Sequence, residues 1–238
     1  MRAPHAFEPS ENCLKCKFRK AAFFCGLDGP ALRDFDAIKS LAVYPGNALL
    51  FIEKEDPRGV FVLCEGEVKL SMASREGRTL ILRFAKPGEV LGLTAVVAGI
   101  PYEVTAETLT PSQLAFVRRN DFLKFLEHHP GNYEAISKYL ISVYASACNQ
   151  LRSVGLSPIP RRLAKLLLDW SDEAGRQERI DCRITMRLTH EEIGEFIGST
   201  RETVTRTLGD FETRHIISLR DGSVTINDRK TLEAMAAA

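Results

Sequence analysis

The sequence contains no uninterrupted apolar segment long enough to cross a membrane. A transmembrane helix needs about 20 consecutive apolar residues, and no run in the 238 residues approaches that length. Residues 1–10 also lack an apolar stretch after Arg2, so we expect no secretory signal peptide. We therefore expect a cytoplasmic protein with no membrane contact.

An excess of charge of either sign is also missing. Lys and Arg number 32 against 31 Asp and Glu, which leaves a net charge of +1. Bulk charge therefore neither favours nor excludes a nucleic-acid partner. Hydrophobic residues make up 45% and charged residues 26% of the chain, a mixture that excludes a disordered or fibrous protein. At this length we expect two domains, each with a core of its own.

The residue patterns of hydrolytic and metal-dependent catalysis are absent as well. Residues 45–117, which read as strands, contain no histidine. No Ser/His/Asp or Cys/His spacing recurs elsewhere in the chain. These constellations supply nucleophiles and general bases, so we expect that the protein is not an enzyme. A metalloenzyme built on the strand region is the weakest of the alternatives.

The strand region is marked by its alternation and its turns. Apolar and polar side chains alternate over residues 68–72, Leu80, Leu82 and Phe84 repeat the spacing, and turn signals recur about every ten residues between Pro45 and Pro101. Period-two alternation between regular turns predicts a β-roll or jelly roll. We assign it to residues 28–127, with a short helix at 30–42 before the strands and another at 120–127 after them.

One long helix is predicted after the strands, within residues 128–156. Its apolar residues recur at steps of three and four, which places them on one face. Such a stripe packs either on the β-roll of the same chain or on a second copy, and the length of the helix favours a symmetric dimer. The residues assigned to this dimer interface are Ile136, Leu140, Val143, Ala147 and Leu151.

A break rich in proline separates this helix from the last domain, residues 157–238. Residues 162–170 read as a helix and 172–177 as a loop. Thr189 and Glu192 form a capping box that starts a helix, and Gly198 ends it. Thr200 can cap a second helix, with Val204 on its apolar face. A two-residue turn at 221–222 then predicts a β-hairpin. Two short helices followed by such a wing predict a winged helix-turn-helix.

The second helix of this unit carries polar side chains suited to reading DNA. An arginine can donate two hydrogen bonds to the O6 and N7 atoms of guanine, and a glutamate can accept one from the N4 amino group of cytosine. The alternative is a solvated helix held by a Glu202–Arg206 pair. The candidate DNA-binding residues are Ser199, Thr200, Arg201, Glu202, Thr205 and Arg206.

Residues 188–208, which read LTHEEIGEFIGSTRETVTRTL, resemble the helix-turn-helix of the CRP/FNR family of bacterial transcription regulators. The order of the parts is also similar to that family. The resemblance implies an α+β fold with an N-terminal β-roll like a cyclic-nucleotide-binding domain, a long dimerisation helix and a C-terminal winged helix-turn-helix.

The resemblance further implies a homodimer that binds palindromic double-stranded DNA, with half-sites one helical turn apart and RNA polymerase as a partner. Arg201, Glu202 and Arg206 correspond to the base-contacting residues of the cyclic-AMP-responsive members. We therefore expect TGTGA-like half-sites.

The effector is a separate question. In this alignment Leu93 stands where the cyclic-AMP-responsive members carry a ribose-binding glutamate, and Ile100-Pro101 stand in place of their phosphate-binding Arg-Ser pair. Because an apolar pair cannot hold a phosphate, we expect no cyclic nucleotide. A small molecule, zinc, a cyclic nucleotide or constitutive activity are the alternatives to the redox input described next.

Three of the six cysteines, Cys13, Cys16 and Cys25, lie within the N-terminal segment 1–27. In a reducing compartment such a cluster favours a metal or redox site over disulfides, and thiolates suit zinc or iron-sulfur clusters. A tail without metal is the alternative.

The three cysteines resemble those that hold an oxygen-sensing 4Fe-4S cluster in some family members. Those members take a fourth ligand from the β-roll, where residues 112–117 of this chain contain no cysteine. Ser112 and Cys64 are the alternatives for that place. The hypothesis is therefore a regulator that senses oxygen or redox state through an N-terminal 4Fe-4S cluster, with zinc as the alternative metal.

Overall fold

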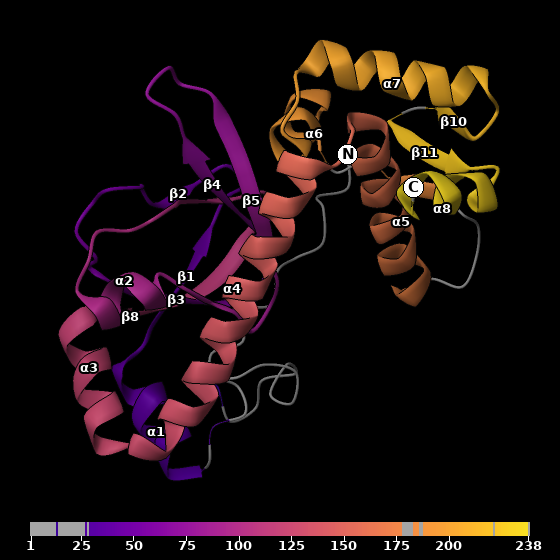
Figure 1. Ribbon diagram of the computed structural model, residues 1–238. Helices are drawn as coiled ribbons and strands as arrows, with labels where there is room; N and C mark the ends of the chain where they lie inside the picture. The colour runs from indigo at the N-terminus through magenta and orange to yellow at the C-terminus, as the bar shows by residue number, and fades with distance from the viewer. Residues whose placement is uncertain are drawn as a thin grey trace. The chain divides into compact units, whose positions relative to one another are not determined.

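The computed structural model describes Cys13, Leu27 and residues 29–177, 183–185, 188–220 and 222–237. The chain divides into two compact units (Figure 1). The first runs up to residue 76 and continues over 82–146, and the second comprises 77–81 and 147–238. Within the described residues, no helix is both long and apolar enough to cross a membrane.

The first unit contains the predicted β-roll, and the α+β class is confirmed. One four-stranded sheet has the order β1-β8-β3-β6 and the other the order β2-β7-β4-β5. The strands of the first sheet are β1 (Ser40–Tyr44), β8 (Ser112–Arg118), β3 (Gly59–Glu65) and β6 (Val90–Leu91). Those of the second are β2 (Leu49–Phe51), β7 (Thr105–Thr108), β4 (Val68–Ala73) and β5 (Thr79–Ala85).

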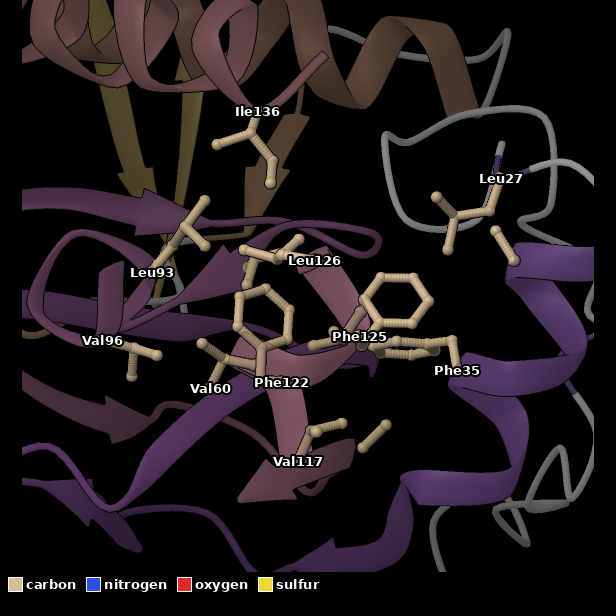
Figure 2. Close-up of a cluster of buried hydrophobic side chains, with 14 of the residues drawn as sticks. Leu27, Phe35, Val60, Leu93, Val96, Val117, Phe122, Phe125, Leu126 and Ile136 are labelled. Carbon is tan, nitrogen blue, oxygen red and sulfur yellow. The ribbon is translucent and has the colours of Figure 1, made fainter. Parts of the chain in front are cut away.

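Helices α1 (Gly29–Ile38), α2 (Leu93–Ala98) and α3 (Arg119–His128) accompany the strands. Figure 2 shows their apolar side chains meeting those of β3 and β8 in one cluster. Phe35 of α1 and Phe125 of α3 pack edge to face, with ring centroids 5.7 Å apart, a favoured aromatic geometry. Burial of such side chains stabilises the unit by about 1.5–3 kcal/mol each.

The helix predicted over 30–42 is shorter than expected, because α1 ends at Ile38 and β1 begins at Ser40. All five residues of β1 pair antiparallel with β8, from Ser40 opposite Phe116 to Tyr44 opposite Ser112. This partner lies some 70 residues away in the sequence, so local periodicity could not reveal it. Pairing across the sheet therefore overrides the local helical pattern.

Helix α4 (Tyr133–Leu156) follows the short 3₁₀ turn Pro130–Asn132. Ile136 is 3% exposed and belongs to the core of the first unit, and Leu140 packs against that core. Both side chains therefore pack on the β-roll of the same chain. This is the alternative to a dimer interface that the sequence left open. Val143 and Ala147 are half-buried. Four large apolar side chains of α4 are more than 60% exposed: Ile141 at 66%, Tyr144 at 71%, Leu151 at 73% and Leu156 at 81%.

The second unit contains the predicted helix-turn-helix and a three-stranded sheet in the order β10-β11-β9. The expected loop at 172–177 is wrong, because α5 continues through Gln177. Asp172 in this stretch pairs with Arg229 of α8 at 2.6 Å, a contact that supports the extra helical turns. Helix α8 and strand β9 were not predicted. The elements are α5 (Ile159–Gln177), β9 (Arg183–Thr185), α6 (His190–Ile197), α7 (Arg201–Thr213), β10 (Ile217–Arg220), β11 (Ser223–Ile226) and α8 (Arg229–Ala237).

Candidate nucleic-acid interface

Helix α6 begins with the capping box that the sequence predicts. The hydroxyl of Thr189 accepts a hydrogen bond from the Glu192 backbone N–H at 3.2 Å. In return the Glu192 carboxylate accepts one from the Thr189 N–H at 2.9 Å. Two amides that lack a partner inside the helix are thereby satisfied. Ile193 and Ile197 are buried, and Phe196 is half-buried.

The turn between α6 and α7 depends on two glycines. Gly198 ends α6 with a φ of 64°, in the left-handed region that favours glycine. A Cβ on Gly194 would lie 3.0 Å from the Ser199 carbonyl oxygen, so glycine lets the start of α7 approach α6 closely. Thr200 then caps α7, its hydroxyl accepting from the Thr203 N–H at 3.3 Å. The second predicted cap is thus confirmed.

The carboxyl end of α6 is tied to residues that precede the helix-turn-helix. The Arg162 guanidinium donates to the Ile197 carbonyl, and its Nε donates to the Ser157 carbonyl at 2.7 Å. The Gln150 amide donates to the Phe196 carbonyl at 2.6 Å. These bonds satisfy carbonyl groups that the helix end leaves without partners. These bonds fix the position of α6 within the second unit. They also fix α7 indirectly, because the short turn joins it to α6.

The outer face of α7 carries the four predicted polar side chains, Arg201, Glu202, Thr205 and Arg206, and all are exposed. Val204 is buried, as predicted, together with Leu208 and Phe211. Among the described residues, no ion pair joins Glu202 to Arg206.

Glu202 is directed to the start of its own helix. Hydrogen bonds from its own backbone N–H, and then from the Thr200 hydroxyl, lower the pKa of this exposed carboxyl group. The group is therefore an ionised acceptor at neutral pH. An anion at the first turn is also favoured by the helix dipole.

One residue of the surface, His190, was not predicted. Its Nδ1 lies 2.8 Å from the Thr205 hydroxyl, and that hydroxyl donates its hydrogen to the Arg201 carbonyl at 2.9 Å. The hydroxyl has a single hydrogen, so the Nδ1–H of His190 is the donor to Thr205. His190 thereby links the first turn of α6 to the exposed face of α7.

The wing is formed by β10 and β11, which pair antiparallel with Arg220 opposite Ser223. Only residues 221 and 222 separate the two strands, as the two-residue turn predicts. Gly222 has a φ of 71°, as hairpin turns of this length require. Asp221 lies outside the described residues.

Of the predicted cluster ligands, Cys16 and Cys25 lie outside the described residues. Cys13 is half-buried at the edge of the first core, and its backbone N–H donates to the Asp36 carboxylate of α1 at 3.0 Å. Cys64 packs at the edge of the same core. Within the part of the chain that the structure describes, no three Cys, His, Asp or Glu side chains are grouped to hold a metal ion.

Ser112, the other alternative for a fourth ligand, is fully buried. Its hydroxyl donates to the Thr110 carbonyl at 2.7 Å and accepts from the Glu67 N–H at 3.3 Å. These bonds give Ser112 a structural role at the start of β8. Among the described residues of the first unit, Cys13 and Cys64 are the cysteines, and both pack against the same core.

The residues that replace the nucleotide-binding positions are apolar or bulky. Leu93 is 2% exposed, and Ile100 and Pro101 are exposed. The next residue, Tyr102, stacks on Phe51 with centroids 4.0 Å apart, and its hydroxyl donates to the Gly59 carbonyl at 2.8 Å. None of these side chains carries a positive charge for a phosphate.

Fold and surface together define a winged helix-turn-helix protein with an N-terminal β-roll. Residues 41–129 match the family model of the cyclic nucleotide-binding domain, and 161–235 match that of the Crp-like helix-turn-helix domain. The chain belongs to the CRP/FNR family of DNA-binding transcription regulators, which are not enzymes.

Similar proteins include the transcriptional activatory protein AadR of Rhodopseudomonas palustris, which is 28% identical over 99% of this chain and 100% of its own length. The CRP-like cAMP-activated global transcriptional regulator of Mycobacterium tuberculosis is 27% identical over 91% of this chain and 97% of its own. The structure of FixK2 from Bradyrhizobium japonicum has a TM-score of 0.71 at 21% identity, covering 84% of this chain and 98% of that one.

Proposed function

We propose that the protein binds a palindromic DNA site as a homodimer and reads TGTGA-like half-sites with Arg201, Glu202 and Arg206. The observation that supports this most is the exposed face of α7, where both arginines and an ionised carboxylate lie on the first two turns without forming a Glu202–Arg206 pair. Ser199, Thr200 and Thr205 lie at the start of the same surface. We propose a cytoplasmic location, and RNA polymerase as a partner of the DNA-bound protein.

The variant Arg206→Ala tests base reading. A bidentate arginine contact with guanine contributes about 1–3 kcal/mol of discrimination, so we expect that loss on a TGTGA palindrome and little change on a scrambled duplex. Fluorescence anisotropy at one fixed salt concentration measures both. Arg214→Ala is the matched control, because Arg214 is exposed beyond the end of the same helix and pairs with Asp210. Equal losses on both duplexes would mean that Arg206 contacts only phosphate.

We propose further that Cys13, Cys16 and Cys25 hold an iron-sulfur cluster, which would make DNA binding respond to oxygen or redox state. The support is the thiol spacing, together with the attachment of Cys13 to α1 through Asp36. Movement of this segment would act directly on a helix of the β-roll core.

Anaerobic purification followed by visible absorption and by iron, sulfide and zinc analysis tests the cluster. We expect a brown protein containing iron and sulfide, and loss of both in Cys16→Ser. Cys148→Ser on α4 is the control that keeps them. A colourless, iron-free protein after anaerobic reconstitution contradicts the cluster, and stoichiometric zinc in that protein identifies the alternative metal.

A cyclic nucleotide is the second candidate effector, because the β-roll matches the cyclic nucleotide-binding model and the M. tuberculosis relative is described as cAMP-activated. The buried Leu93 and the apolar Ile100-Pro101 pair weigh against it, because a phosphate needs positive charge or converging donors. We expect no heat of binding when cyclic AMP is titrated into the protein.

A further inference from the structure

We propose that a hollow beside the first turn of α3 binds a small organic dianion, with a phosphate or dicarboxylate group on an apolar body. The hollow has a volume of about 580 Å³ and lies entirely within the first unit. A volume of 300–1,000 Å³ is usual for small-molecule sites. Neither the proposed DNA-reading face nor the cysteine segment uses its residues.

Three arginines line this hollow: Arg58 from the turn before β3, Arg118 at the end of β8 and Arg119 at the start of α3. Among the described residues, none of their side chains has a hydrogen-bonding or ion-pairing partner. Asp121 is the one acidic residue in the lining. Three guanidinium groups around one concavity repel each other, and a bound dianion removes that repulsion.

Arg119 points most directly to a ligand. Its Nε atom is buried and has no acceptor among the described residues. A buried donor without an acceptor is costly, and native structures rarely leave one. An oxyanion is the acceptor that suits it best, because phosphate and carboxylate accept two parallel hydrogen bonds from one guanidinium group.

The N-terminus of α3 adds positive electrostatic potential to that of the three arginines. This helix has ten residues, and its N-cap residue, Arg118, makes no side-chain capping bond. The first amides of an uncapped helix point outward and carry a partial positive charge. The Arg119 N–H is already used by the Arg58 carbonyl at 2.9 Å, which holds two of the three arginines together. The next residues of this turn, Asn120 and Asp121, also line the hollow.

An apolar wall specifies an organic anion instead of a bare ion. Pro57 and Phe116 line the hollow beside the arginines. The Phe116 ring lies directly on Gly59, where an added Cβ would come within 2.7 Å of the ring. The glycine therefore sets the position of the ring. Arginines beside an aromatic face suit a molecule that joins an oxyanion to a flat or apolar group.

The test uses the Arg119 Nε–H as a reporter, in ¹H–¹⁵N spectra of the full-length protein without DNA. Phenyl phosphate and phenylmalonate serve as probes that distinguish a phosphate from a dicarboxylate ligand, and inorganic phosphate tests the apolar wall. We expect a saturable shift of the Arg119 resonance with at least one phenyl probe, at about tenfold higher affinity than with inorganic phosphate.

The double variant Arg58→Gln/Arg118→Gln keeps the reporter and removes two charges. Both side chains are exposed, so the melting temperature should not change, while probe affinity should fall at least about tenfold. Arg33→Gln, an exposed arginine on α1, should bind as the unaltered protein does. The proposal is overturned if no probe shifts the Arg119 signal up to about 10 mM, or if the double variant binds with unchanged affinity.

Discussion

At the scale of single residues, the DNA-reading surface depends on a few positions whose roles follow from local chemistry. Thr189 and Thr200 start the two helices, and Gly198 ends the first in a left-handed conformation. Such roles involve neighbours within three or four residues, so the sequence predicts them. His190 was missed because its partner, Thr205, is 15 residues away. The only signal in the sequence was the position of His190 directly after Thr189, the N-cap of α6.

Asp36 gives a pH-dependent prediction at the same scale. Burial opposes its ionisation, but the hydrogen bond from Lys39, that from the Cys13 N–H and the Lys39 charge outweigh it and lower the pKa of Asp36. A carboxyl group with a depressed pKa stabilises the folded state above its unfolded value, about 3.9, and loses this effect as pH falls through the folded value.

We therefore expect Asp36→Asn to cost about 1–3 kcal/mol of unfolding free energy at pH 7. The difference from the unaltered protein should stay constant down to about pH 5 and shrink below about pH 4. Urea unfolding at several pH values measures it. Asp34→Asn is the control, because the Asp34–His129 pair is largely exposed on the Asp34 side and should contribute less than about 1 kcal/mol. A difference that grows in acid would contradict the assigned role of Asp36.

At the scale of elements, α4 has two neighbouring apolar faces with different roles. Ile136 and Leu140 pack on the first core. The Tyr139 hydroxyl donates to the Val90 carbonyl at 2.8 Å, and the half-buried Arg83–Glu89 pair lies beside it. Burial, followed by the smaller effect of Glu89, raises the pKa of Tyr139 against the opposing influence of Arg83. This face docks the helix on the β-roll, and we place the interface of the proposed homodimer on the exposed face.

The exposed face predicts where a charge disrupts the dimer. Ile141→Glu or Tyr144→Glu should give folded monomers that no longer bind a palindrome, because an ionised side chain cannot be buried between two apolar helices without a partner. Ile136→Glu should instead unfold the β-roll, because this side chain is 3% exposed in the core of one chain.

Light scattering with size-exclusion chromatography measures the mass, and circular dichroism the fold. Ser142→Glu, exposed on another face of α4, should remain a dimer. A dimer that survives both Ile141→Glu and Tyr144→Glu would place the interface elsewhere.

The sequence predicted elements where the signal is local and failed where it is not. The helices α3, α6 and α7 and the hairpin β10–β11 were found from periodicity, caps and a two-residue turn. Strand β9 was missed because it is defined by pairing with β11, some 40 residues later. Periodicity placed Ile136 on an apolar face but could not say that the β-roll of the same chain covers it, because both possible partners demand the same spacing.

At the scale of the whole molecule, the fold pairs a β-roll with a winged helix-turn-helix, and the match of both parts to family models makes the protein a transcription regulator. Its near-neutral charge does not conflict with that role, because specific DNA contacts rest on a few placed arginines instead of bulk charge. The same reasoning applies to the β-roll, where three arginines gather around one hollow in a chain of net charge +1.

Selection of bound duplexes from a random pool by the full-length protein tests the central claim most directly. The account predicts enrichment of a two-fold symmetric site whose TGTGA-like half-sites are one helical turn, about 10 base pairs, apart. Enrichment of no sequence, or of a single asymmetric half-site, would contradict a homodimer that reads bases through α7.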